Sequence, residues 1–397
     1  MKKHILIVSQ YFYPEQFRIN DMACEWVKRG YRVTVLTGIP NYPQGKFYQG
    51  YGWFKRRKES WNGIDIIRIP LIARGHSSIG MVMNYLSFVV SGFFWKCFTK
   101  IKADYVFTFE VSPMTQALVG VWYAKRRKIP HYLYVQDLWP ENVEIVTGIH
   151  TRAVIGPIEK MVKYIYRKSD RVLATSPSFV REIQKRIPDE AEKVSYWPQY
   201  AEDFYRRGEA RSELIPQDGK LNVTFTGNIG TAQGLEILPK TATLLKSMGA
   251  NVRFNIVGDG RNKERLTKEI TDAGVSEYFN MIDRRPAEEM PAILAASDVA
   301  FLSFADNRLY SMTIPAKLQS YMACACPILA VAEGETRRIV TEAECGVCTP
   351  FGDAEALAQA IMRLTREELE QMGRAAEQYF KNHFDKKTLM DDLERYF

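Results

Sequence analysis

The chain has 397 residues, of which 46% are apolar and 25% are charged. This length predicts two or three domains, and the composition excludes a disordered chain or a repeat array. The charge is uneven, because residues 1–200 hold 30 Lys and Arg against 16 Asp and Glu, whereas the remainder holds 24 against 30. Such a basic first half fits an anionic membrane, a phosphorylated lipid or nucleic acid as a partner, or a set of solvated loops.

The first apolar run, residues 5–8, is too short for a signal peptide and predicts a strand. Six cysteines are too sparse for a disulfide scaffold, which favours a reduced, cytoplasmic setting. The pairs Cys324/Cys326 and Cys345/Cys348 raise the possibility of zinc. Because the first pair lies in an apolar segment, small buried thiols are the favoured interpretation.

An uncharged segment of nineteen residues, Ser77 to Trp95, approaches the length of a membrane span. Asn84 and several serines argue against a span, and the lysines at 96, 100 and 102 suit an interfacial helix. Three interpretations stay open. They are a buried or partly buried helix, which is favoured, a surface helix that dips into the bilayer, and a true span.

Apolar runs that suit strands alternate with helix patterns along almost the whole chain, which is typical of parallel sheets covered by helices on both faces. We expect two doubly wound, Rossmann-like α/β domains, residues 1–200 and 201–375, with a polar hinge at 206–220. A final helix pattern, 376–397, is expected to pack back on the first domain. Strands are expected at residues 4–9, 32–37, 64–69, 105–109, 131–135 and 171–175, and then at 222–225, 252–257, 279–282, 299–302, 327–331 and 346–348.

A glycine-rich turn, Thr226 to Glu236, follows the first strand of the second domain and precedes a helix pattern. A strand, a glycine turn and a helix N-terminus form a phosphate cradle, because glycine lets the backbone approach a ligand and the first-turn amides favour an anion. The dinucleotide fingerprint of dehydrogenases is missing, since the first turn of the chain, Gln10 to Asn20, has no glycine. A nicotinamide enzyme is therefore not expected.

Seven short motifs follow one another at Ser9–Glu15, Thr37–Pro43, Ser112–Thr115, Gln136–Glu141, Gly227–Gly234, Val257–Gly260 and Ile314–Ala323. In this order and spacing they resemble the family 4 glycosyltransferases of the GT-B type, particularly the WbuB-like branch that builds bacterial surface polysaccharides. The likeness covers nearly the whole chain. It implies two Rossmann-like domains facing each other across a cleft, with a nucleotide sugar held mainly by the second domain and an acceptor mainly by the first.

A leaving diphosphate gains negative charge, so a transferase must place cations or hydrogen-bond donors around it. The sequence contains no Asp-x-Asp triplet, and no metal is expected. The resemblance makes Lys317 the first cationic candidate and Arg308 the second, with a surface cation as the alternative for each. Gln136 and Asp137 complete the catalytic candidates. The donor-binding candidates are Gly227, Asn228, Gly230, Gln233, Gly258, Arg284, Arg285, Asn307, Thr313, Ile314, Pro315, Ala316, Gln319 and Ser320.

The sequence departs from the wider family pattern at several positions. The Arg and Lys that many members have in the turn are replaced by Asn228 and Gln233, and the family's paired glutamates fall on Met312 and Ser320. The frequent histidine of the first domain falls on Gln136. These departures look typical of the WbuB-like branch, and they imply an altered donor preference.

Uracil recognition is expected in the loop of Arg284 and Arg285, where an arginine face can stack on the ring; a charged turn in solvent is the alternative. Family 4 enzymes retain anomeric configuration, and the departing phosphate is pictured as taking the acceptor proton. If Asp137, Glu110 or Glu15 acts as a base, an inverting route reopens. The acceptor-side candidates are Glu15, Arg18, Asn20, Asn41 and Glu110.

The resemblance thus implies a retaining, metal-independent transferase that moves an N-acetylated 6-deoxy amino sugar, with N-acetylfucosamine first, from a UDP-sugar to a polyprenyl-diphosphate-linked saccharide in O-antigen or capsule synthesis. No cofactor besides the UDP-sugar co-substrate is expected, and no nucleic acid. The basic first half and residues 77–95 predict peripheral attachment to the inner face of the plasma membrane. Two alternatives stay open, a GT-B-shaped UDP-sugar epimerase and a non-catalytic nucleotide-sugar-binding protein.

Overall fold

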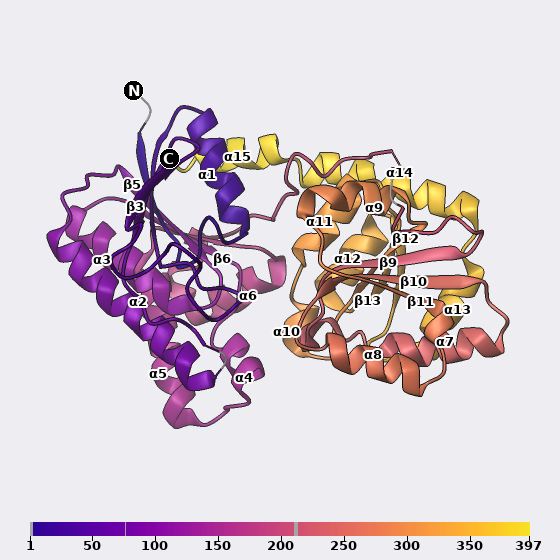
Figure 1. The fold of residues 1–397 in the computed structure, drawn as a ribbon. Helices are drawn as coiled ribbons and strands as arrows, with labels where there is room; N and C mark the ends of the chain where they lie inside the picture. Colours follow the sequence, from indigo (N-terminus) through magenta and orange to yellow (C-terminus); the bar gives the residue numbers. More distant parts are fainter. Residues whose placement is uncertain (1–2, 76, 210–212) are drawn as a thin grey trace. The chain divides into compact units, whose positions relative to one another are not determined.

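A computed structural model describes residues 3–75, 77–209 and 213–397. The chain divides into two compact units: unit 1 is Met1–Trp197 with Phe397, and unit 2 is Pro198–Tyr396 (Figure 1). The boundary after Trp197 lies close to the one expected after residue 200. The hinge expected at 206–220 includes residues 210–212, which lie outside the described residues.

Unit 1 is built on an eight-stranded sheet in the order β3-β4-β2-β1-β5-β6-β7-β8. The neighbouring strands run parallel except at the edge, where β3 pairs antiparallel with β4. The central strands are apolar and buried on both faces, as predicted for a covered parallel sheet. The strands are β1 (His4–Val8), β2 (Arg32–Thr37), β3 (Lys58–Trp61), β4 (Ile64–Arg68), β5 (Tyr105–Glu110), β6 (His131–Val135), β7 (Arg171–Ala174) and β8 (Val194–Tyr196).

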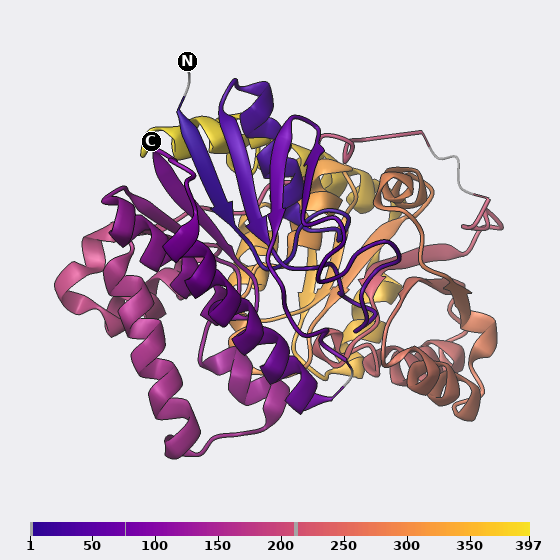
Figure 2. The same cartoon turned by 60° about the vertical axis from the view of Figure 1, so that its left-hand side comes forward.

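Helices cover both faces of this sheet (Figures 1 and 2). On one face, Leu6 of β1 packs in a cluster with Phe88 of α2 and Tyr123 of α3. On the other, Trp26 of α1 meets Phe107 of β5, with ring centroids 5.0 Å apart. The helices are α1 (Arg18–Lys28), α2 (Ser78–Phe98), α3 (Ala117–Arg127), α4 (Glu141–Thr147), α5 (Arg152–Lys168) and α6 (Pro177–Arg186), with short 3₁₀ turns η1 (Met114–Gln116) and η2 (Pro188–Lys193).

Unit 2 has a parallel six-stranded sheet in the order β11-β10-β9-β12-β13-β14. One face packs mainly against α7, α8 and α13, and the other against α11, α12 and α14. The strands are β9 (Leu221–Asn228), β10 (Val252–Asp259), β11 (Phe279–Ile282), β12 (Val299–Ser303), β13 (Ile328–Val331) and β14 (Gly346–Thr349). The helices are α7 (Ile237–Ser247), α8 (Lys263–Asp272), α9 (Met290–Ala295), α10 (Arg308–Ser311), α11 (Ala316–Ala323), α12 (Gly334–Glu342), α13 (Ala354–Arg363), α14 (Arg366–His383) and α15 (Lys386–Glu394), with 3₁₀ turns η3 (Thr231–Gln233), η4 (Ser276–Tyr278) and η5 (Ala287–Glu289).

The prediction of two doubly wound α/β domains is confirmed, with every expected strand present. Two short edge strands, β3 and β8, were not expected, because a polar or three-residue strand leaves little hydrophobic pattern. The packing of residues 376–397 on the first domain stays a prediction. The helix pattern at 376–397 is divided between α14 and α15, which Asp385 caps by accepting from the Thr388 amide at 2.8 Å, and both helices belong to unit 2. Phe397 alone belongs to unit 1, where its ring stacks on Tyr105.

The cysteines of the two pairs considered for zinc are part of the packing of unit 2. Cys324, Cys326 and Cys345 are buried in the cluster that includes α11 and α12. Within the described ranges, no group of three or more His, Cys, Asp or Glu side chains is placed to hold a metal ion.

Helix α2 contains the uncharged segment 77–95. It is long and apolar enough to cross a membrane by length and composition, with a mean hydropathy of 1.3 and 17% of that window buried. However, Phe88 is buried in the core of unit 1, and Asn84 donates to the Ile72 carbonyl at 2.6 Å and accepts from Gln10 at 2.7 Å. These contacts join the inner face of α2 to unit 1, so α2 is a partly buried helix of that unit.

Gly120 sets the closeness of α3 to the sheet. A Cβ at this position would lie 2.4 Å from Thr108 Oγ1 and 2.8 Å from His131 Nε2, two atoms that are already hydrogen-bonded to each other. We therefore expect Gly120→Ala to lower the free energy of unfolding by about 1–3 kcal/mol. The control is Gly156→Ala in α5, where a Cβ meets no atom within 4 Å and alanine favours the helix. Thermal unfolding measures both, and equal effects would contradict this packing.

Candidate functional site

The donor-binding candidates gather in unit 2 around the carboxyl ends of its parallel strands. The strand order reverses between β9 and β12, and open α/β sheets bind ligands at such a point. Gly227 of β9 pairs with Gly258 of β10, and a Cβ at 258 would lie 1.9 Å from the Gly227 carbonyl oxygen. Gly227 also has a φ of 132°, which favours glycine. The two strand tips therefore present backbone without side chains.

The glycine-rich turn is held in shape by its own side chains and by β12. Gln233 Oε1 accepts from the Gly230 amide at 3.2 Å, and Ala305 donates to the Ala232 carbonyl at 3.0 Å. The hydroxyl of Ser303 donates to the Gln233 carbonyl. Gln233 thus supports the turn through its oxygen, and only its Nε2 can donate to a ligand. Asn228 is exposed at the tip of β9.

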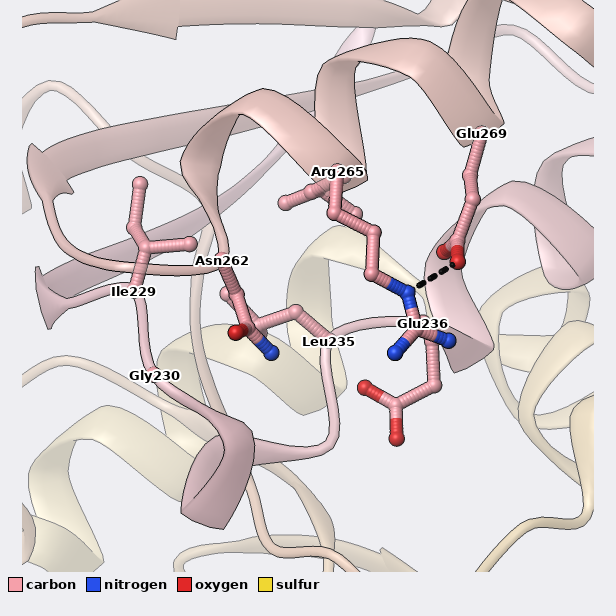
Figure 3. A pocket seen from close by; sticks show the side chains of 8 residues that line it. Ile229, Gly230, Leu235, Glu236, Asn262, Arg265 and Glu269 are labelled. Atoms are coloured by element: carbon pink, nitrogen blue, oxygen red, sulfur yellow. Dashed lines mark hydrogen bonds and ion pairs between the residues drawn. The ribbon is translucent and has the colours of Figure 1, made fainter.

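A small pocket lies beside this turn, between it and α8 (Figure 3). Arg265 points into it but is paired with Glu269 at 2.8 Å, and Glu236 adds a second carboxylate. Two carboxylates around one paired arginine do not favour an anion. A diphosphate therefore fits the strand tips better than this pocket.

Lys317 is the cation that the structure brings to the strand tips. Its Nζ is buried 3.9 Å from the Phe225 ring centroid and 3.3 Å from the place of a Cβ on Gly227. Nζ has no hydrogen-bond partner among the described residues, and burial lowers the pKa of Lys317 to about 7. A buried ammonium without a counter-ion is costly, so an anion bound here would stabilise the charged form of Lys317.

The segment before α11 supplies backbone to the same place. Ile314 is buried and anchors the segment, and Pro315 is the N-cap of α11. Thr313 is fixed by its hydroxyl, which donates to Leu309 at 2.9 Å, and by its carbonyl, which accepts from Thr336 at 3.0 Å. The amides that begin at Ala316 open a helix, and such amides lack partners within the helix itself.

Gln319 and Ser320 lie on the buried side of α11. The Gln319 amide nitrogen donates to the carbonyls of Pro315 and Ala316 at 2.9 and 3.2 Å, and the Ser320 hydroxyl donates to Ala316 at 3.3 Å. Both side chains are therefore engaged inside the helix, where they brace its first turn. Met312 is also buried.

The remaining candidates of unit 2 lie at or near its surface. Asn307 caps α10, because its side chain accepts from the Leu309 amide at 2.8 Å, and Arg308 is exposed as the first residue of that helix. Arg284 and Arg285 follow β11 and are exposed, with Arg285 paired to Glu289 at 2.8 Å. Arg285 is thus held along its own loop.

In unit 1 the strand order reverses between β1 and β5, and the acceptor candidates follow the strand ends there. Glu15 is buried, and its Oε1 accepts from the amides of Asn41 and Tyr42 at 2.8 and 2.7 Å. Burial raises the pKa of Glu15 to about 7 even though these bonds favour the ionised form. Asn20 donates to the Glu15 carbonyl at 2.7 Å, and Arg18 begins α1. Glu15 therefore joins the loops that follow β1 and β2.

Two further carboxyl groups, those of Glu110 and Asp137, lie at the end of β5 and just after β6. Glu110 is fully buried, and neither of its carboxyl oxygens has a hydrogen-bond partner among the described residues. Burial first, and the nearby Asp137 second, raise the pKa of Glu110 well above its usual range. Asp137 accepts from the Ser112 amide at 2.6 Å, and the Gln136 amide donates to the Glu110 backbone carbonyl at 2.8 Å. This upward shift of the pKa favours the protonated form of Glu110, which suits a donor of a hydrogen bond better than a base.

Sequence reasoning did not select the amides that connect these groups. Gln116 Oε1 accepts from the Gln10 amide at 2.6 Å, and Asn84 joins Gln10 to Asn41, whose Oδ1 accepts from Asn84 at 3.3 Å. The available signal was Asn84 itself, a polar residue at the inner face of an otherwise apolar helix.

The burial of Lys317 has a pH-dependent cost. Below pH 7 the buried side chain is charged in the folded protein, and the cost of burying that charge lowers the free energy of unfolding. This cost disappears as the pH rises from about 7 toward the ordinary pKa of 10.5. Lys317→Met removes the group, so we expect the variant to unfold at a higher temperature than the wild type, with a larger excess at pH 6 than at pH 9. Lys240→Met, on the exposed surface of α7, is the control and should show no such trend. A pH-independent excess for Lys317→Met would contradict the assignment.

Two family models match the chain. The glycosyl transferase 4-like domain matches residues 16–197, and the glycosyl transferases group 1 model matches residues 206–381. WbjE of Pseudomonas aeruginosa, named as a glycosyltransferase, is 29% identical over 251 residues, which is 61% of each chain. WcaI of Escherichia coli, named for colanic acid biosynthesis, is 25% identical over 97% of both chains.

Among solved structures, sucrose-phosphate synthase of Thermosynechococcus elongatus superposes with a TM-score of 0.79 at 16% identity, covering 100% of this chain and 99% of that one. HepE of Anabaena, solved with UDP-glucose, gives 0.71 at 14% identity with the same coverage. The fold is therefore GT-B. Because the two family models together match most of the sequence, one on each unit, the chain belongs to the glycosyltransferases that combine a glycosyl transferase 4-like domain with a group 1 domain.

Proposed function

We propose that this glycosyltransferase is a retaining, metal-independent family 4 enzyme that transfers an N-acetylated 6-deoxy amino sugar, N-acetylfucosamine first, from a UDP-sugar to a polyprenyl-diphosphate-linked saccharide in O-antigen or capsule synthesis. The observation that carries the proposal is Lys317, a buried ammonium without a partner among the described residues beside the bare tip of β9. A diphosphate is the ligand that matches it.

On the donor side, Lys317 would bind a diphosphate oxygen, and the amides of Ile314 and Ala316 with the backbone at Gly227 would donate to others. Pro315 has no amide hydrogen, and the Thr313 amide is already bonded to the Tyr310 carbonyl at 3.2 Å. As the bond from the anomeric carbon to the phosphate oxygen breaks, negative charge develops on that oxygen. Fixed donors in a site shielded from water stabilise this charge without reorganisation. The absence of an Asp-x-Asp triplet from the sequence supports stabilisation by protein groups.

On the acceptor side, the hydroxyl oxygen would form the new bond to the anomeric carbon on the face that the phosphate leaves, and its proton would pass to the departing phosphate oxygen. Glu110 fits this route because burial and the nearby Asp137 raise its pKa and so favour the protonated carboxyl, which can orient a sugar hydroxyl without removing its proton. The buried Glu15 and the half-buried Asp137 are further carboxyls of this unit that could meet the acceptor.

The relatives support the class of product, since WcaI is named for colanic acid biosynthesis and AmsK of Erwinia amylovora for amylovoran biosynthesis. HepE, solved with UDP-glucose, supports a UDP-sugar donor. The amino sugar and the branch rest on the resemblance in the motifs. Peripheral attachment to the cytoplasmic face of the plasma membrane is part of the proposal, because a polyprenyl-linked acceptor lies there.

The defining experiment incubates the protein with UDP-sugars, with and without a polyprenyl-diphosphate-linked saccharide, and identifies the products. We expect a lengthened lipid-linked saccharide with the donor's anomeric configuration. An epimer formed from the donor alone would replace the proposal with an epimerase. Binding of UDP without any product from a panel of acceptors would replace it with a binding protein.

Binding of UDP should be coupled to a proton. Because Lys317 is largely neutral above pH 7 in the free protein and charged beside a diphosphate, we expect uptake of up to one proton per UDP at about pH 8 to 9. Calorimetry in two buffers of different ionisation enthalpy measures this uptake. Lys317→Met should bind UDP without it, and uptake that persists in the variant would assign the proton to another group.

Lys317→Ala should reduce turnover more than donor affinity, because the charge that it stabilises grows in the transition state. We expect a fall in kcat of about 100- to 1000-fold, typical for loss of one fixed donor to a developing oxyanion, with a much smaller change in the Kd for UDP. Lys240→Ala is the matched control in the same unit. Equal losses in kcat and affinity would show that another group stabilises the leaving charge.

A further inference from the structure

Helix α2 lies on the outside of unit 1 (Figure 2), and it carries a series of exposed apolar side chains. Eight large side chains of this helix are between 43% and 80% exposed. At 100° per residue they fall on one side of the helix, and the buried residues fall on the opposite side. The exposed set is Ile79, Val82, Met83, Leu86, Val90, Phe93, Phe94 and Phe98, called the α2 stripe below.

The opposite face fixes α2 to unit 1, so the stripe is a stable surface. Phe88 is buried in the core, and Gly92 allows close approach to α3, since a Cβ there would lie 2.4 Å from Val119. Ser77 caps the helix by accepting from the Gly80 amide at 3.0 Å. A single apolar stripe of this length on a folded monomer marks an interaction surface.

Basic residues gather at the C-terminal end of the stripe. Arg126 of α3 donates to the Lys96 carbonyl, and Arg127 donates to the Thr99 carbonyl at 2.7 Å, which joins the basic end of α3 to the end of α2. Lys96 Nζ lies 4.4 Å from the Phe93 ring centroid, at the edge of the stripe. Residues 77–103 and 111–136 contain no Asp or Glu. The exposed basic side chains here are Lys100, Lys102, Lys125, Arg126 and Lys128.

We propose that the α2 stripe docks on an anionic phospholipid bilayer, with α2 lying in the plane of the interface. An apolar stripe flanked by lysines and arginines, with no acidic residue in either helix, matches acyl chains below and phosphate headgroups beside them. A symmetric second copy of the chain fits less well. It would contribute the same basic residues to the interface and no acidic group to pair with them.

The same helix brings the acceptor candidates to the bilayer surface. Asn84, on the face opposite the stripe, is hydrogen-bonded to Gln10 and Asn41, and the Asn41 amide donates to Glu15. An α-helix with its side chains is about 10–12 Å across. Residues bonded to its inner face therefore lie about one helix diameter above the acyl chains, which is the level of a headgroup phosphate. This step rests on the proposed function, since it takes the acceptor to be lipid-linked.

Flotation with vesicles tests the docking. The probes are phosphatidylcholine vesicles with and without about one third phosphatidylglycerol, and the variant Leu86→Glu/Phe94→Glu places two charges in the stripe. We expect the wild type to float with the anionic vesicles, more weakly as salt rises, and the variant to lose at least 10-fold in partitioning. Met248→Glu/Met362→Glu, at exposed positions of unit 2, is the matched control and should float like the wild type.

The outcomes separate this inference from the function. Equal flotation of the stripe variant and the wild type, no flotation of the wild type, or a dimer that the stripe variant dissolves would overturn the docking. An unchanged melting temperature and UDP affinity show that the variant is folded. Flotation without sugar transfer would leave the docking intact and reject the transferase. If both hold, the variant should raise the KM for acceptor embedded in vesicles and leave kcat on a short-chain soluble acceptor unchanged.

Discussion

Both units depend on one constraint, the parallel order of strands outward from a central pair. β1 and β5 form that pair in unit 1, and β9 and β12 form it in unit 2. The loops that follow parallel strands all lie at the carboxyl ends of those strands. Where the strand order reverses, the loops after the two central strands run in opposite directions and leave room for a ligand between them. The candidate residues Glu15, Glu110, Gly227 and the segment leading into Lys317 all reach their positions through this geometry. Within each unit, the positions of these residues depend on the order of the strands more than on the conformation of the loops.

Near the carboxyl ends of the strands in each unit, burial leaves polar groups without the partners that water would supply. Lys317 has a buried ammonium beside an aromatic ring, and Glu110 has a buried carboxyl beside another acid. Each group is held nearer its neutral form, and each would interact more strongly with a ligand than an exposed residue of its type because little solvent competes.

The sequence predicted what depends on local pattern. Strands such as β1 and β9 are apolar and bounded by turns, so their positions and the α/β class were predictable. The close approach of Lys317 Nζ to Gly227 was not predicted, although the resemblance named both residues as candidates for the same ligand. Strand β3 was not predicted, because its polar side chains give no hydrophobic pattern and it is held in the sheet by pairing with β4. The hydrogen bonds of Gln319 and Ser320 inside α11 depend on the rotamers of these side chains. Asn84 bonds to Asn41, 43 positions away in the sequence, and to Gln10, 74 positions away. Such contacts leave no periodic signal in the chain.

Phe397 gives the folding of the protein an unusual order. Its ring stacks on Tyr105 at 4.6 Å and lies 5.2 Å from Tyr132 and 5.9 Å from Trp26, yet residues 198–396 belong to the other unit. Unit 2 is therefore an insertion within unit 1 in the topological sense. During synthesis the ribosome has released nearly all of unit 1 long before this ring emerges. The aromatic cluster on that face can be completed only after the whole of unit 2 has been made.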